Sequence, residues 1–159
     1  MSRIDEVESR LGDGTDEATV EKMMGAFSID AVNHAASMGV VLDYTEDSLQ
    51  AVEDILARLE ADRPKGLSKF YRKGPSEADI QTVAKLYGAY IGETIRFEWG
   101  VGEWVIPEEG PFQGALTLKY DEAMISPPAK VYKRITEGNV DNIVYYYQVF
   151  KQRFLEDRA

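Results

Sequence analysis

The chain has 159 residues, enough for one domain with a hydrophobic core, and its 44% hydrophobic and 29% charged residues are typical of a globular protein. The absence of cysteine excludes disulfide bonds, cysteine nucleophiles and cysteine-ligated metals. No apolar run approaches the roughly 18 residues that a membrane helix needs, and the polar N-terminus does not resemble a signal peptide. The default expectation is therefore a cytosolic protein without membrane contact.

The net charge of −10 is concentrated in one part of the chain. Residues 1–63 contain 15 acidic and 5 basic side chains, whereas residues 64–159 are neutral overall. Such asymmetry steers a basic partner toward one face, although an acidic surface that only aids solubility gives the same pattern. The negative sign argues against the binding of nucleic-acid phosphates by this part.

The N-terminal half predicts two helices. Residues 1–15 are expected to be a loosely held polar segment that ends in a glycine-containing turn. Apolar residues at helical spacing predict a helix over about 16–38, and a second helix is expected over 45–63. Residues 64–75 are predicted to be an internal linker. Its mixture of basic and aromatic residues suits single-stranded nucleic acid, but an ordinary solvated loop is the commoner explanation.

A third helix begins with the capping-box pattern of Ser76 and Asp79. Along it, Ala84, Gly88 and Gly92 recur every four residues and form a face of small residues. Each glycine costs a helix about 1 kcal/mol relative to alanine, so close packing should offset that loss. The expected packing partner is the hairpin or the C-terminal helix of the same chain, and a helix of another subunit is the alternative.

The remainder of the chain predicts a small antiparallel sheet and two helices. Strand patterns occur at residues 103–106 and 114–120, and a further short strand is expected at 123–125. Helices are predicted over 126–138 and 140–156. The chain is thus predicted to be a single α+β domain over residues 1–159, with N-terminal helices, a central glycine-lined helix, a small antiparallel sheet and two C-terminal helices.

Catalytic motifs are sparse. His34 is the only histidine, which excludes a histidine zinc pair and favours a structural role for this residue. Gly100 and Gly102 follow a helix and precede a strand, the reverse of the order in phosphate-binding loops. No EF-hand spacing is present, and neither a metal nor a cofactor is predicted. Four residues are candidates for a cleft that holds a small ligand or, with two carboxylates, hydrolyses one: Glu93, Trp99, Glu103 and Trp104.

The segment around the third helix resembles small bacterial domains of unknown function. The matching positions are Gly88, Gly92, Glu93, Gly100 or Gly102, and Trp104. The resemblance extends over about residues 80–150 and implies no particular activity. Some small acidic bacterial proteins of this general type are immunity partners of secreted toxins.

The leading hypothesis is a non-catalytic cytosolic domain that meets a basic protein partner, for example as an immunity protein, and binds neither nucleic acid nor membrane. The last helix has an apolar stripe from Val140 to Tyr147 and beyond, so Tyr145 or Tyr146 must point elsewhere and suits an interface, including that of a homodimer in place of a monomer. The candidate partner-binding residues are Glu46, Asp47, Glu53, Asp54, Tyr145 and Tyr146.

Overall fold

A computed structural model describes residues 1–12, 18–64 and 74–159. Within these residues the protein has the predicted α+β fold. In chain order the elements are α1 (Arg3–Arg10), α2 (Val20–Ser37), the 3-10 turn η1 (Glu46–Ser48), α3 (Leu49–Asp62), α4 (Glu77–Trp99), β1 (Glu103–Val105), β2 (Thr117–Tyr120), β3 (Ala123–Ile125), α5 (Pro127–Glu137), the 3-10 turn η3 (Asn139–Asp141) and α6 (Ile143–Asp157).

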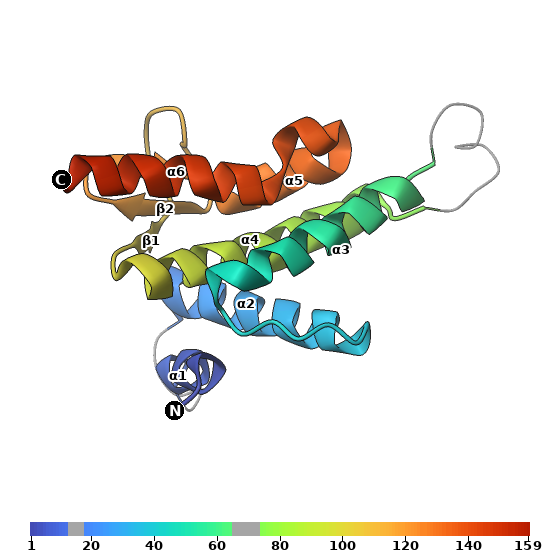
Figure 1. The fold of residues 1–159 in the computed structure, drawn as a ribbon, viewed down its shortest axis with the longest axis horizontal. Coiled ribbons are helices and arrows are strands. Elements are labelled where there is room, and N and C mark those ends of the chain that lie inside the picture. The colour runs from blue at the N-terminus through green and yellow to red at the C-terminus, as the bar shows by residue number, and fades with distance from the viewer. Residues whose placement is uncertain (13–17, 65–73) are drawn as a thin grey trace.

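Helix α4 is the central element. Figure 1 shows it crossing the molecule, with α1 and α2 on one side and the sheet, α5 and α6 on the other, while α3 lies alongside. The predicted capping box is confirmed, since Ser76 and Asp79 each accept a hydrogen bond from the other's backbone N–H. The helix ends at Gly100, which adopts a left-handed conformation with φ of 71°.

The glycine face of α4 packs against the same chain, as predicted. A Cβ atom on Gly88 would lie 2.4 Å from the Cα of Pro128 at the start of α5, and one on Gly92 would lie 2.1 Å from the indole of Trp104. Gly92 thus packs against the hairpin, as expected. The partner of Gly88 is α5 rather than the last helix. Both contacts are too close for any side chain, which explains why glycine occupies two interior positions of a helix.

The three strands form an antiparallel sheet in the order β1-β2-β3. Trp104 of β1 pairs with Leu118 of β2, which in turn pairs with Ile125 of β3. All three side chains are buried. The predicted hairpin and the short third strand are therefore confirmed, and their apolar faces contribute to the core.

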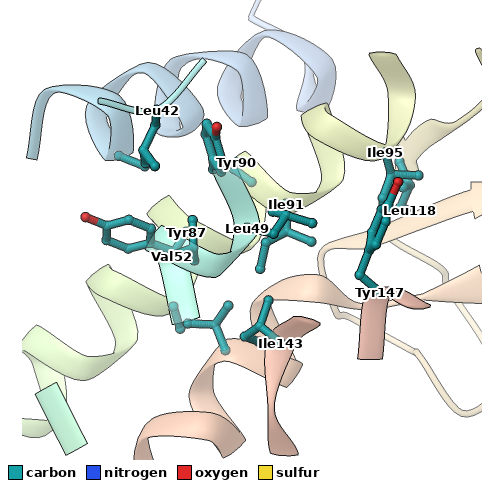
Figure 2. Packing of buried hydrophobic residues seen from close by; sticks show 14 of the residues in the cluster. Leu42, Leu49, Val52, Tyr87, Tyr90, Ile91, Ile95, Leu118, Ile143 and Tyr147 are labelled. Atoms are coloured by element: carbon teal, nitrogen blue, oxygen red, sulfur yellow. The ribbon is translucent and has the colours of Figure 1, made fainter. Parts of the chain in front are cut away.

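Four tyrosines in the core are held by hydrogen bonds of their hydroxyl groups. Tyr44, Tyr87, Tyr90 and Tyr147 are essentially inaccessible, and Figure 2 shows the last three among aliphatic side chains from several elements. The Tyr90 hydroxyl accepts the backbone N–H of Tyr44 at 2.8 Å, and the Tyr87 hydroxyl lies 2.6 Å from Nδ1 of His34. His34 therefore has the structural role that was predicted for it.

Two expectations at the ends of the chain are wrong. Residues 3–10 form helix α1 instead of a loosely held segment, because Val7 is buried against the core and Ser2 closes a capping box. Val140 is 84% exposed in η3 and does not belong to the stripe of the last helix, which begins only after its cap, Asn142. Residues 13–15 of the predicted N-terminal segment and 65–73 of the predicted linker lie outside the described residues.

Candidate functional site

Glu53 does not lie on the surface, which corrects its prediction as a partner-binding residue. Glu53 is 4% exposed, and both oxygens of its carboxylate lie 2.9 Å from the Nε–H donor of Arg134, with Nη2 of Arg134 2.8 Å from Oε2. It also accepts the backbone N–H of Ile143 at 3.0 Å. Glu53 therefore joins α3 to α5 and to the start of α6, and a partner protein cannot reach it.

The other three predicted acidic residues divide into two kinds. Glu46 accepts hydrogen bonds from Lys151 at 2.9 and 3.0 Å and from the hydroxyl of Tyr147 at 2.7 Å, so it ties η1 to α6. These bonds, with that from Lys151 the largest effect, lower the pKa of Glu46. Asp47 and Asp54 are exposed and remain available to a partner.

The two predicted tyrosines also differ in their exposure. The Tyr145 side chain is 69% exposed on α6. Tyr146 is partly buried, with its ring centroid 4.9 Å from that of Phe150 and 5.3 Å from Nζ of Lys130. Of these two tyrosines, only Tyr145 presents an exposed ring.

The four residues of the predicted cleft do not converge. Trp99 stacks on Phe154 of α6 at 4.8 Å and donates its indole N–H to Tyr147. Trp104 packs over Gly92 of α4. Glu103 precedes Trp104 on β1 and is exposed, because successive strand residues point to opposite faces. Of the four residues, the structure brings only Glu93 and Trp104 close to each other.

Glu93 belongs to a charged cluster that connects three elements. Its carboxylate is 2% exposed and accepts Nη1 of Arg96 at 3.1 and 3.2 Å. The same nitrogen lies 2.7 Å from Oε2 of Glu21 on α2. The other oxygen of Glu21 accepts the backbone N–H of Trp104 at 2.9 Å. One guanidinium thus serves two carboxylates and links α2, α4 and β1.

This cluster borders a cavity of about 240 Å³ between α1, α2 and α4. We call it the Glu93 cavity; it is lined by Val7, Arg10, Leu11, Glu21, Lys22, Gly25, Glu93 and Arg96. Gly25 forms a wall without a side chain, since a Cβ there would come within 3.1 Å of Leu11. The lining therefore combines three cations and two carboxylates with a small apolar wall.

The pKa of Glu93 is shifted from its ordinary value. Burial raises the pKa of Glu93, and the charge of Glu21 raises it further, while Arg96, Arg10 and the nearby indole of Trp104 partly oppose the shift. Nε1 of Trp104 is buried and has no partner in full hydrogen-bond geometry among the described residues. A titratable group with a perturbed pKa in a cavity is the usual mark of a functional site.

Sequence reasoning found Glu93 and missed the residues around it. Its contact with Arg96 could have been predicted, because residues three apart on a helix are neighbours. Arg10, Glu21 and Lys22 come from other helices, and no sequence pattern places them beside Glu93. Among the described residues there is no group of three or more His, Asp or Glu side chains arranged to hold a metal ion.

Comparisons with known proteins add nothing to the geometry: no family model matches the chain, and no curated protein or solved structure is significantly similar to it. The resemblance to a bacterial domain family stays a prediction. None of the helices in the described part of the chain has the length and apolar character needed to cross a membrane.

Proposed function

We propose that this protein is a non-catalytic cytosolic binding domain and that the Glu93 cavity binds a small zwitterion of the amino-acid type. The observation that supports the proposal is a buried carboxyl group of raised pKa in a cavity that also contains cationic side chains. Ligand sites are concave and mostly apolar, with a few polar groups that fix orientation.

The chemistry of the lining defines the ligand class. Arg10, whose guanidinium also pairs with Glu6 at 2.8 Å, supplies positive charge for a ligand carboxylate, and Glu93 supplies an acceptor for an ammonium group. Val7 and Leu11 offer apolar contact for a short side chain. A cavity of about 240 Å³ is below the roughly 300–1,000 Å³ of sites for drug-sized ligands, which favours a smaller metabolite.

Binding is favoured over hydrolysis by the position of the second carboxylate. Glu93 and Glu103 were the two carboxylates of the predicted hydrolase, but Glu103 lies on the solvent side of β1 while Glu93 lines the cavity. The carboxylate beside Glu93 is Glu21, which shares Arg96 with it and holds the backbone of Trp104. Both carboxylates therefore also hold the fold together.

The two tryptophans allow a direct test. In a ¹⁵N-labelled sample each gives one indole signal, and an amino acid in the Glu93 cavity should shift the signal of Trp104 but not that of Trp99, whose N–H is already bonded to Tyr147. We expect at least one amino acid from a panel to do so, with affinity about tenfold weaker in Glu93→Gln. Glu103→Gln is the matched control. No response from the panel, or an equal response in Glu93→Gln, would contradict the proposal.

A second candidate function is the binding of a basic protein partner, in the manner of an immunity protein that neutralises a toxin. The observation in its favour is that the acidic part of the sequence, residues 1–63, includes α1, α2 and α3, and that α1 and α2 lie on the side of α4 away from α5 and α6 (Figure 1). Exposed Asp47 and Asp54 belong to this acidic side, and exposed Tyr145 would contribute from α6.

Salt and charge reversal test this second function. A lysine- and arginine-rich peptide should bind with an affinity that falls steeply with ionic strength, and Asp47→Lys with Asp54→Lys should weaken it. Reversal of Glu108 and Glu109, which are exposed in the neutral half, should have little effect. Salt-independent binding, or equal losses in both double variants, would argue against an acidic interface.

A further inference from the structure

A second hollow lies between α4, the hairpin and α5. We call it the α4–α5 groove; it has a volume of about 410 Å³ and is lined by Gln81, Ala84, Lys85, Gly114, Ala115, Leu116, Ser126, Pro128, Ala129, Tyr132 and Lys133. Small side chains from α4, the hairpin and α5 leave this space open. The close approach of Gly88 to Pro128 fixes its base.

The rim of the groove carries two cations without partners. Lys85 and Lys133 are exposed, and within the described residues neither forms an ion pair or hydrogen bond. The other polar groups are already engaged: Tyr132 donates to Glu77 at 2.7 Å, and Ser126 donates to the carbonyl of Leu116 at 2.8 Å. The charge that the groove leaves unsatisfied is therefore positive, although the protein as a whole is strongly acidic.

An adjoining hollow of about 200 Å³ extends the groove along α5. The two share Ser126, Ala129 and Lys133. The second is also lined by Lys130, which is paired with Asp141 at 2.6 Å, and by aromatic and apolar side chains: Phe112, Met124, Ile125, Tyr146 and Phe150. A ligand with its charged end between the lysines can therefore continue into apolar surroundings.

The start of α5 distinguishes between kinds of anion. Phosphate sites at helix N-termini rely on several free backbone N–H groups. Here the first two helical residues are Pro127 and Pro128, which have no N–H, and the N–H of Ala129 is bonded to Ser126. The groove offers side-chain ammonium groups without such a cradle, which suits a carboxylate.

We propose that the α4–α5 groove binds a small amphipathic carboxylate, with its headgroup between Lys85 and Lys133 and its hydrocarbon tail along α5. This site is independent of the Glu93 cavity and shares no residue with it. Charge complementarity selects the headgroup, and the apolar continuation of the groove selects the tail.

Octanoate is the probe, with octanamide as its uncharged counterpart. Octanoate should bind more tightly than octanamide and should shift backbone amide signals of residues 114–116 and 129–133. The double variant Lys85→Gln with Lys133→Gln should bind octanoate about tenfold more weakly and no longer discriminate between the two compounds. Lys119→Gln, at an exposed lysine of β2 outside the groove, is the matched control.

A second variant tests the groove without altering its charge. Ala129 is exposed on a helix, so Ala129→Leu should fold normally while its side chain fills the hollow, and octanoate binding should be lost. Circular dichroism and the unfolding midpoint show whether each variant remains folded. The proposal is overturned if octanoate does not bind, if it binds no better than octanamide, if both variants bind like the wild type, or if the shifted amides lie elsewhere.

Discussion

Glu53 and Glu93 are both buried carboxylates beside an arginine, yet their environments differ. Glu53 has Arg134 and a backbone N–H as donors, so its oxygens are fully used within the fold. Glu93 shares Arg96 with Glu21 and borders a cavity, and its pKa is raised. Under the proposed function, Glu53 is a purely structural buried carboxylate, whereas Glu93 also contacts a ligand. Burial is common to both, and the completeness of hydrogen bonding separates them.

The largest expected effect is at the ion pair of Glu53 and Arg134. Glu53→Ala leaves Arg134 buried without its main partner and should lower the free energy of unfolding by about 3–5 kcal/mol. Replacing both residues by leucine should cost less, because no uncompensated charge remains. Urea denaturation measures both, with Asp54→Ala on the exposed side of α3 as the control. A loss below about 1 kcal/mol in Glu53→Ala would remove the contrast with Glu93.

An effect of intermediate size on stability is expected from a substitution that displaces the indole of Trp104, which lies beside Glu93. In Gly92→Ala the new methyl group collides with Trp104, and the free energy of unfolding should fall by about 1–3 kcal/mol. The indole N–H signal of Trp104 should shift while that of Trp99 stays. Lys85→Ala, on an exposed face of the same helix, should be nearly neutral. If Gly92→Ala left the Trp104 signal unchanged, the close contact between α4 and the hairpin would be wrong.

The smallest expected effects on the free energy of unfolding are those of Glu93 and Glu46, and they depend on pH in opposite directions. Because the pKa of Glu93 is raised in the folded state, folding is favoured by its proton, and this contribution is lost as pH rises from the ordinary value of 4.5 through the folded-state pKa. Glu93→Gln should therefore remove a decline in stability that the wild type shows over that window.

The pKa of Glu46 is lowered, so its contribution is present above pH 4.5 and is lost as pH falls through the folded-state pKa. Glu46→Gln should cost up to about 1 kcal/mol at neutral pH and nothing in strong acid. Unfolding free energies measured from pH 3 to 8 would test both carboxylates. Curves of the same sign for the two variants would contradict the assigned environments.

Local patterns predicted the fold well where local chemistry determines it. The capping box of Ser76 and the glycine spacing of α4 each depend on neighbours in sequence. Helix α1 was missed because its eight residues are mostly polar and a single residue, Val7, anchors it to the core. Its capping box of Ser2 and Asp5 is a local pattern, but the tertiary contact of Val7 is not.

The candidate site was less predictable than the fold. Glu53 lies four residues after Leu49 and three before Leu56, so helical spacing alone places it near the buried stripe of α3. The cluster around Glu93 is different, because Glu21 and Arg10 reach it from separate helices. Only the packing of α1 and α2 against α4 brings these charges together.

The glycine contacts of α4 also bear on how this sequence can change over time. Gly88 can accept a side chain only if Pro128 moves, and Gly92 only if Trp104 is replaced by something smaller. Each position is therefore coupled to one distant position. Among diverging copies of this gene, we expect the two members of each pair to vary together or not at all. Such paired variation would reveal the packing of α4 from sequences alone.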